Sequence, residues 1–376
     1  MKKLGVYLHI PFCSRKCSYC AFNSETVKGS EIVDKYVDAI ILDIERFDFS
    51  DYIVDTVYIG GGTPSQLSVF HLKKILRVIK LNCNLSNNVE FSVEYNPEDV
   101  DKEKIKTIKD EGVNRLSIGL QSSKKKILNF INRNHTKQDF LDTVKYAKES
   151  GIENISADIL VGIPGQSIGD LKSTLKLLIK NNLDHISMYD LIFEENTPMY
   201  KILKSSDIKP FSDKKLLKMY DKATSYLSKK GLQRYEVSSF SKTGFESRHN
   251  IKYWRLDEYI GFGVSAHSFI NKKRYENNVN INEYISNIQN NKSVVLKFSE
   301  ISLDEYREEF LLLGLRMVNG ISLLEYEKNF VSNLLEYRKE KIKDLKKLNL
   351  IDYNSERLWL TKKGFELLNT VILELI

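Results

Sequence analysis

Short hydrophobic runs alternate with amphipathic stretches through the first half of the chain. The short runs are typical of buried strands, and the stretches between them repeat apolar residues at the spacing of one helix face. Strands are predicted at Leu4–Ile10, Asp55–Gly60, Val89–Tyr95, Asn114–Ile118, Asn154–Leu160 and His185–Leu191. Helices are predicted at Glu31–Phe47, Ser65–Ile79, Lys102–Glu111, Lys124–Asn132, Lys137–Glu149 and Ile168–Lys180.

Six such repeats predict an α/β fold built on a parallel sheet, because a helix that connects two parallel strands crosses over in a right-handed sense. We expect a partial (β/α)6 barrel of the TIM type over residues 1–200. In such barrels the loops after the strands carry the chemistry, so the residues that follow each predicted strand are the first candidates for a functional site.

The pattern changes after about residue 200. A helix at Asp213–Lys229 and a strand-like run at Gln233–Phe240 precede a stretch rich in glycine and aromatic residues. The Asn-rich segment Asn277–Lys292 then indicates a linker with one short helix. These features predict a small β/α extension over residues 201–295.

The last part of the chain, residues 296–376, is predicted to be helical. Three helices precede a short hairpin at Leu350–Leu360 and a final helix, a combination similar to a winged helix. Winged helices bind DNA but also serve as docking modules. The region Lys341–Lys347 carries no dense basic stripe beyond ordinary helix charge, which argues against nucleic acid as a partner.

The composition is that of an ordinary globular protein, with 376 residues of which 42% are hydrophobic and 28% charged. No run of about 18 uncharged apolar residues is present, so no membrane-spanning segment is expected. The segment Met1–Cys13 resembles a signal peptide, but its apolar run is short and alternates like a strand, so we interpret it as the first core strand. We therefore expect a cytoplasmic protein. The net charge of +7 comes mainly from lysines spread along helices and indicates a solvated surface.

Three of the four cysteines, Cys13, Cys17 and Cys20, form a C-x3-C-x2-C cluster just after the first predicted strand. In a cytoplasmic chain such a cluster indicates metal rather than disulfides, because thiolates are soft ligands for iron–sulfur clusters and zinc. A [4Fe–4S] cluster on three cysteines keeps one iron without a protein ligand, whereas zinc needs a fourth ligand, for which His9 is nearest. Cys83 is interpreted as a plain thiol.

Glycines and polar residues follow the next predicted strands. The run Gly60–Gly62 comes after the second strand, where glycines let the backbone approach a ligand and expose its N–H groups. Four polar residues stand on or after strands three, four and five, and they are Glu94, Gln121, Arg133 and Asp158. Because the ends of successive parallel strands meet at one edge of a barrel, these residues are expected to form one site.

The cysteine spacing at the end of the first strand of a β/α barrel resembles the radical S-adenosylmethionine (SAM) superfamily. The resemblance implies a [4Fe–4S] cluster on Cys13, Cys17 and Cys20, with SAM bound at the open iron and cleaved to a 5′-deoxyadenosyl radical. It also implies that the glycine motif receives the amino group of SAM and that Glu94 binds the ribose.

A narrower resemblance lies in the motifs VYLHIPFC, CSYCAFNS, GGGTPS, SIGLQS, DILVGIPGQ and SRHNIKYW. They are similar to the coproporphyrinogen-oxidase-like branch of the superfamily, and within it to the HemW-type heme chaperones. The similarity extends over nearly the whole chain, from Leu4 to Asn369. It implies SAM contacts at Tyr7, Tyr19, Gly61, Gly62, Thr63, Glu94, Gln121, Arg133 and Asp158.

The same resemblance associates the segment His249-Asn-Ile-Lys-Tyr253-Trp254 with heme binding. An imidazole can ligate heme iron, and aromatic side chains can pack on a porphyrin face. His249, Tyr253 and Trp254 are therefore candidates for a heme site. His267 is a second candidate for the axial ligand, although its surroundings in the sequence favour a core or turn position.

Two departures distinguish this chain from the oxygen-independent coproporphyrinogen III oxidases of the same branch. Phe22 stands where those enzymes carry a fourth cysteine, and the first predicted strand begins near residue 4, without their N-terminal arm. We therefore expect a chaperone that delivers heme to acceptor proteins, with SAM cleavage serving a regulatory or unknown step and no catalytic residue assigned. The alternative is an oxidase that converts two propionates to vinyl groups. For electron supply, a basic surface fits a small acidic flavodoxin or ferredoxin.

Overall fold

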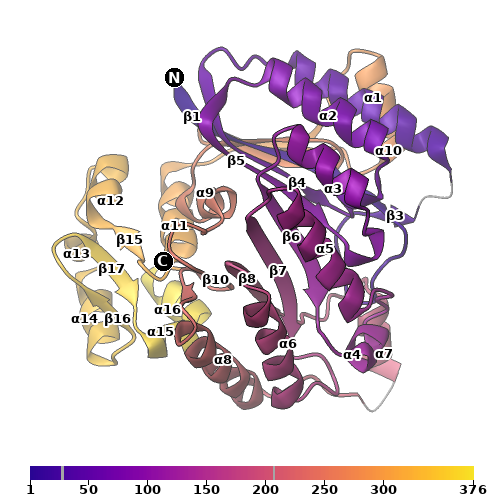
Figure 1. The fold of residues 1–376 in the computed structure, drawn as a ribbon. Coiled ribbons are helices and arrows are strands. Elements are labelled where there is room, and N and C mark those ends of the chain that lie inside the picture. Colours follow the sequence, from indigo (N-terminus) through magenta and orange to yellow (C-terminus); the bar gives the residue numbers. More distant parts are fainter. Residues whose placement is uncertain (27–28, 206–207) are drawn as a thin grey trace.

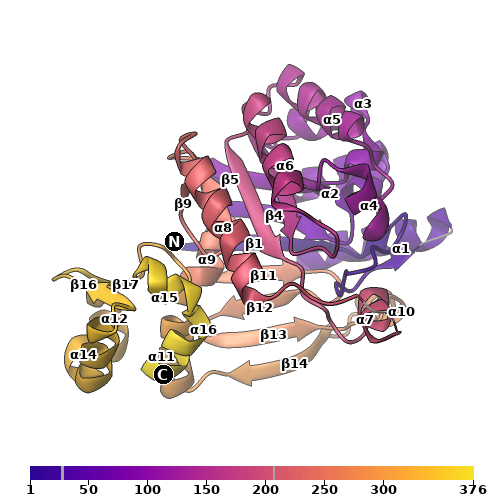
Figure 2. The ribbon, with the colours of Figure 1, turned by 90° about the horizontal axis from the view of Figure 1, so that it is seen from below.

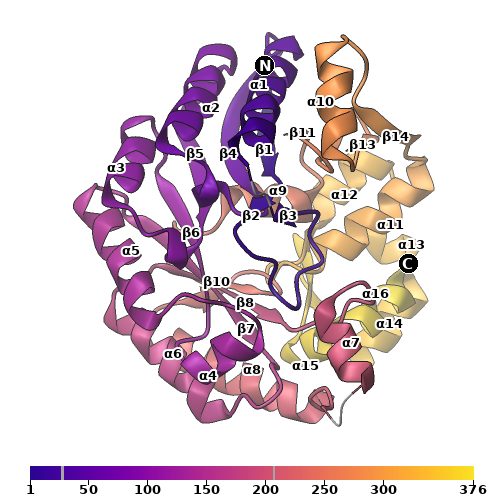
Figure 3. The same ribbon diagram turned by 90° about the vertical axis from the view of Figure 1, so that its right-hand side faces the viewer.

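Seven parallel strands form the centre of a twelve-stranded sheet in the computed structural model, which describes residues 1–26, 29–205 and 208–376. The parallel strands curve into an incomplete barrel (Figure 3). In spatial order they are β11 (Tyr259–Phe262), β1 (Lys2–Ile10), β4 (Tyr52–Gly61), β5 (Leu85–Tyr95), β6 (Arg115–Gln121), β7 (Asn154–Val161) and β8 (His185–Asp190). The six strands predicted from the sequence, and the α/β fold class, are confirmed.

Strand β11 is absent from the sequence predictions because glycine interrupts its hydrophobic pattern. Gly261 stands opposite Tyr7 of β1 in the parallel register. A Cβ atom at Gly261 would lie 2.2 Å from the carbonyl oxygen of His267, so close packing of this strand requires glycine. The residue that weakens the local strand signal is thus the one that lets the strand pack.

Amphipathic helices cover the outer face of the parallel strands (Figures 1 and 3). They are α1 (Ser30–Arg46), α2 (Val69–Asn82), α3 (Lys102–Asp110), α5 (Lys137–Glu149), α6 (Ile168–Lys180) and α8 (Asp213–Ser228), with the short α4 (Lys125–Phe130) before α5. Each long helix buries its apolar side, as α1 does with Tyr36, Ile40 and Ile44. The predicted helix at Ser65–Ile79 begins later, at Val69, because residues 64–66 form a 3-10 turn and the Ser68 hydroxyl caps the helix.

Antiparallel strands extend the sheet at both edges, as Figure 2 shows on the side of β1. Strands β10 (Ser239–Ser241) and β9 (Gln233–Arg234) follow β8, whereas β12 (His267–Ile270), β13 (Lys273–Asn277) and β14 (Val295–Glu300) follow β11.

The segment predicted as a linker at residues 277–292 contains the expected helix, α10 (Ile281–Gln289), but it is no linker. Tyr284, Ile285 and Ile288 of this helix are buried in the main hydrophobic core, and α10 packs against α1. The Tyr284 hydroxyl donates to Asp43 Oδ2 over 2.6 Å. Asparagines at both ends of the helix make the segment polar in composition, so composition alone does not reveal the apolar side of the helix.

The C-terminal part is helical, as predicted, and has its own core that continues to Tyr259 and Phe269 of the large sheet. Its helices are α11 (Leu303–Gly314), α12 (Leu323–Phe330), α13 (Leu334–Tyr337), α14 (Lys339–Lys347), α15 (Lys362–Glu366) and α16 (Leu368–Leu375). The predicted hairpin is β16 (Ile351–Tyr353) with β17 (Arg357–Leu360), and β15 (Ile321–Ser322) pairs with β17 as a third strand. The division at residues 200 and 295 stays a prediction.

Four further elements lie around the barrel. The short strands β2 (Phe12–Cys13) and β3 (Glu25–Thr26) pair after β1, helix α7 (Pro198–Ser205) follows β8, and helix α9 (Arg248–Arg255) contacts β4. Within the part of the chain that the structure describes, we find no helix with the length and apolar character needed to span a bilayer.

Candidate cofactor site

A pocket of about 450 Å³ opens where the parallel strands end, as predicted for the chemistry-bearing edge of a barrel. Its walls come from the segment after β1 and from the ends of β4 to β8. Most of the predicted site residues line it: Cys13, Cys17, Tyr19, Cys20, Gly61, Gly62, Thr63, Glu94, Gln121, Arg133 and Asp158.

The three thiols of the cysteine cluster share one pocket and are not paired in disulfides. The Thr63 hydroxyl donates to Cys13 Sγ over 3.4 Å, so the glycine loop and the cysteine segment are in contact. Burial raises the pKa of Cys17 and of Cys20, so metal ligation at these thiols is coupled to proton release.

A three-thiol donor set fits an iron–sulfur cluster in its chemistry. Among residues 1–26, 29–205 and 208–376, no group of three or more His, Cys, Asp or Glu side chains is gathered closely enough to hold a single metal ion. His9, the candidate for a fourth zinc ligand, has both ring nitrogens engaged: Nδ1 is 3.0 Å from the Tyr7 hydroxyl and Nε2 is 2.9 Å from the Asn23 carbonyl oxygen.

The glycine loop packs directly on β1. Gly61 has a φ of +112°, and a Cβ there would lie 2.7 Å from the His9 ring. A Cβ at Gly62 would lie 2.9 Å from the carbonyl oxygens of Ile10 and Phe12, while its N–H donates to the former over 2.7 Å. Larger residues would push the loop away from the cysteines, so glycine sets the width of the pocket at this wall.

Two half-buried carboxylates face the same pocket. Glu94 Oε1 accepts from the Tyr58 hydroxyl over 2.8 Å, and Oε2 accepts from the Gly61 N–H over 3.2 Å. Asp158 accepts from the Ser117 hydroxyl, 3.1 Å from Oδ2. Burial, together with repulsion from Asp158, raises the pKa of Glu94 to about 7, and burial also raises the pKa of Asp158. Hydroxyl groups of a ligand would relieve this cost by donating to the carboxylates.

Arg133 brings a buried positive charge to the pocket. Its Nη1 donates to Asn96 Oδ1, and its Nε is buried without a hydrogen-bond partner. A Cβ at Gly119 would lie 2.9 Å from Arg133 Nη2, so a larger residue there would displace the guanidinium. Gln121, on the same wall, has a φ of +59° at the end of β6.

Tyr7 and the heme candidates do not line the pocket. Tyr7 lies behind it, with its ring stacked on Tyr58 at a centroid distance of 6.4 Å. His249 on α9 is fully buried, and both of its ring nitrogens are hydrogen-bonded, Nδ1 to Thr56 Oγ1 over 2.9 Å and Nε2 to the Tyr253 hydroxyl over 2.8 Å. Burial lowers the pKa of His249 to about 3, so its imidazole is neutral. Trp254 is half-buried, and its Nε1 is among the buried atoms without a partner.

His267 differs from its prediction as a core or turn residue. It is exposed at the first position of β12, whereas the three residues that follow it in the strand are buried. Since β11 runs parallel to β1, the turn that leads to His267 lies at the end of the barrel where the pocket opens. There the Asn23 amide donates to the Ser265 hydroxyl over 2.5 Å, which joins this turn to the cysteine segment.

Tyr58 and Asn96 are pocket residues that sequence analysis did not identify. A signal was available for Tyr58: Thr56, Tyr58 and Gly60 alternate along β4 and therefore share one face, the face that leads to the glycine loop. Asn96 follows Glu94 by two positions in the same way, at the end of β5.

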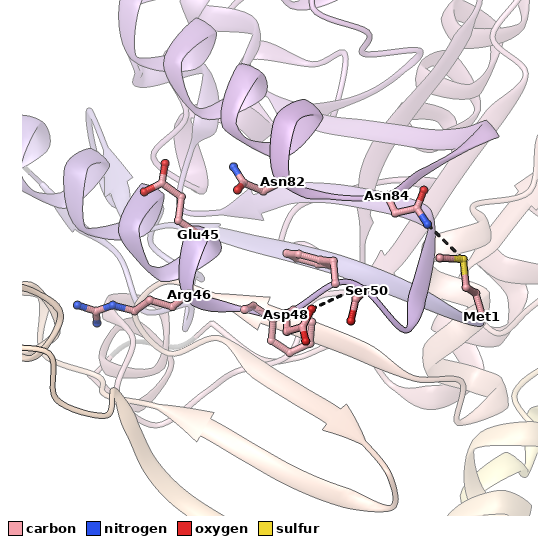
Figure 4. A pocket seen from close by; sticks show the side chains of 9 residues that line it. Met1, Glu45, Arg46, Asp48, Ser50, Asn82 and Asn84 are labelled. Carbon is pink, nitrogen blue, oxygen red and sulfur yellow. Dashed lines mark hydrogen bonds between the residues drawn. The ribbon is translucent and has the colours of Figure 1, made fainter.

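A second pocket of about 450 Å³ lies on the surface at the end of α1 (Figure 4). It is shallow and holds none of the predicted site residues. Its lining consists of Met1, Glu45, Arg46, Phe47, Asp48, Phe49, Ser50, Asn82 and Asn84. Arg46, the cation at this pocket, is already engaged by the Ile288 carbonyl oxygen and Asn291 Oδ1.

Comparison with known families agrees with the architecture of the pocket. The family model of the radical SAM superfamily matches residues 7–178, and that of the HemN C-terminal domain matches residues 301–367. The barrel with its thiol-bearing pocket therefore defines the chain as a radical SAM protein.

Similar proteins narrow this class. Proteins named heme chaperone HemW are 35% identical to the chain in Lactococcus lactis (98% of this chain, 96% of the relative) and in Bacillus subtilis (98% and 97%). The HemW of Mycobacterium tuberculosis is 30% identical over 99% of this chain and 94% of its own. The chain belongs to the HemW family. Its fold is also that of the Escherichia coli coproporphyrinogen III oxidase HemN, with a TM-score of 0.87, 21% identity and coverage of 100% and 90%.

Proposed function

We propose that this protein is a heme chaperone that holds a [4Fe–4S] cluster and SAM, binds heme and passes it to acceptor proteins. The observation that carries the proposal is the single pocket in which three thiols, a glycine loop and two half-buried carboxylates meet. The names of its HemW relatives supply the heme part of the proposal.

In this proposal Cys13, Cys17 and Cys20 ligate three irons of the cluster. The glycine loop and Arg133 orient the methionine part of SAM, and Glu94 accepts from its ribose hydroxyls. The remaining contacts are those at Tyr19, Gln121 and Asp158, whereas Tyr7 lies behind the pocket and stacks on Tyr58. When bound and reduced, the cluster would supply the electron that cleaves SAM to methionine and a 5′-deoxyadenosyl radical. The chain's own residues would hold and orient SAM beside the cluster.

For heme, the exposure of His267 supports it as the axial ligand in place of His249. Heme ligation by His249 would require one of its two buried hydrogen bonds to break and the fully buried imidazole to become accessible. His267 is also the most exposed of the six histidines, all of which lie in the described part of the chain. Phe22, 67% exposed at the pocket mouth, offers an aromatic surface on the same side of the barrel.

A heme titration of the purified protein tests the chaperone proposal. We expect saturable binding of one heme per chain, and we expect His267→Ala to weaken binding and shift the Soret band. His249→Ala should leave the band in place, because the imidazole is not accessible. Wild-type protein without saturable heme binding would refute the chaperone function.

Product analysis distinguishes the oxidase alternative. The fold is that of an oxidase. By the resemblance drawn from the sequence motifs, however, Phe22 stands where the oxidases carry a fourth cysteine. Because small misplacements of a substrate can cost orders of magnitude in rate, we expect no sustained conversion of coproporphyrinogen III to the divinyl product by the reduced, reconstituted protein. Sustained turnover, measured by chromatography of the porphyrins, would favour the enzyme.

The pH dependence of SAM binding tests the role of Glu94. Its pKa of about 7 means that the carboxylate gains its charge near neutral pH, and an ionised carboxylate accepts hydroxyl bonds more strongly. SAM affinity should therefore rise as the pH increases through about 7, measured by anaerobic calorimetry. Glu94→Gln should bind SAM about tenfold more weakly, with a flat pH profile. Glu98→Gln, at the same pocket, is the control and should keep the wild-type profile.

The reductant is proposed to be a small acidic protein such as a flavodoxin or ferredoxin. Arg15 and Lys16 lie at the pocket beside the cysteines, where they can attract an acidic partner to the cluster.

A further inference from the structure

Helix α9, which carries the segment His249–Trp254, is fixed against the barrel strands by charged groups. Glu90 of β5 accepts from the backbone N–H groups of Arg248 (2.9 Å) and His249 (3.0 Å), at the start of the helix. Near its end, Lys252 Nζ lies 2.8 Å from Asp55 Oδ1 of β4, and both side chains are almost fully buried. These contacts from two adjacent strands hold the position of the helix and of the His249 side chain.

The His249 imidazole lies flat against Tyr58. The ring centroids are 5.3 Å apart and the planes differ by 23°. Hydrogen bonds to Thr56 and Tyr253 fix the imidazole from both nitrogens, so the ring cannot rotate away from Tyr58 without leaving buried polar groups unpaired. The orientation of the Tyr58 ring is thereby set by a residue of α9.

Tyr58 connects the His249 ring to the pocket. The Tyr58 hydroxyl donates to Glu94 Oε1, and the other oxygen of this carboxylate accepts from the Gly61 N–H. Tyr7 stacks on the same tyrosine. A displaced Tyr58 would release Glu94 from the geometry that faces the ligand.

We infer that His249 is a positioning residue for the SAM pocket, acting through the ring of Tyr58 on the Glu94 carboxylate. The inference rests on the proposed function in that SAM is the ligand of this pocket. It gives the hydrogen-bonded pair of His249 and Tyr253 a role beneath the pocket, distinct from iron ligation. It also connects helix α9 to the affinity of the barrel for SAM.

A double-mutant cycle on the reconstituted protein tests the inference, with the SAM dissociation constant from anaerobic calorimetry as readout. Tyr58→Phe removes the donor to a charged acceptor and should raise the dissociation constant about tenfold. His249→Ala should raise it by a similar factor. The double variant should resemble Tyr58→Phe alone, because His249 acts through that hydroxyl. His249→Phe, which keeps a ring over Tyr58, should restore most of the affinity.

His185→Ala is the matched control. His185 is also fully buried with both ring nitrogens bonded, to Ser156 Oγ over 2.7 Å and to the Tyr235 hydroxyl over 2.8 Å, but it does not line the pocket. It should lose thermal stability to a similar extent and keep wild-type SAM affinity. If His249→Ala does not fold, His249→Gln, which fills the volume without a ring, replaces it in the cycle.

The outcomes separate the inference from the function on which it rests. Wild-type protein that binds no SAM refutes the proposed function. Wild-type binding together with unchanged affinity in His249→Ala, or with losses that simply add in the double variant, overturns the positioning role. Unchanged SAM affinity with a lost heme spectrum in His249→Ala would assign the residue to heme instead.

Discussion

Loss of all cluster iron is the expected result of replacing Cys13, Cys17 and Cys20 together by alanine. These thiols are the soft donors of the pocket, and Thr63 links the first of them to the glycine loop. An iron–sulfur cluster without thiolate ligands is not retained. Iron analysis and the broad visible absorbance of the anaerobically reconstituted protein measure the effect.

Cys83→Ala is the control for this experiment. Cys83 is buried at the end of α2, outside the pocket, and burial raises the pKa of its thiol to about 12, so it is inert as a ligand. The variant should keep wild-type iron content. A triple variant that retained stoichiometric iron would show that the cluster is held elsewhere.

Lys252→Met is expected to destabilise the fold by about 3 kcal/mol, since removing one partner of a buried ion pair strands the other charge. Lys252 and Asp55 are only 5% and 10% exposed, and their contact fixes α9 to β4. Arg248 Nη2, 3.8 Å from Asp55 Oδ2, compensates part of the loss, which places the effect at the low end of the usual range. Chemical denaturation followed by circular dichroism measures the change.

Lys35→Met provides the comparison on the surface. Lys35 pairs with Glu31 four residues earlier on α1, and both side chains are more than half exposed. Such a pair is screened by water, so the unfolding midpoint should not change. If Lys252→Met also left the unfolding midpoint unchanged, the Asp55–Lys252 pair would not be what fixes α9.

The barrel and most of its pocket could be predicted from the sequence because they depend on local patterns. Each predicted strand from Leu4–Ile10 to His185–Leu191 is a short apolar run, and each ends in or is followed by residues that line the pocket of the folded protein. The cysteine spacing, the glycines and Glu94 all lie directly after such runs. Parallel strands bring their ends to one edge whatever the details of packing, so sequence position alone places these residues in one pocket.

The remaining features depend on contacts between distant segments. Strand β11 is recognisable only beside β1, and the buried side of α10 only against α1. The same holds for the histidines: an isolated motif with His249, Tyr253 and Trp254 indicates a ligand surface, whereas packing buries His249 and leaves His267 exposed.

By itself, the sequence determined the class of the fold, the thiol donors and the polar residues at the strand ends, since period and spacing are properties of adjacent residues. The tertiary structure alone decided that Tyr58 links Glu94 to His249 and that both imidazole nitrogens of His249 are engaged. Burial and hydrogen-bond partners are set by segments far apart in the chain, and no local pattern records which of them will meet.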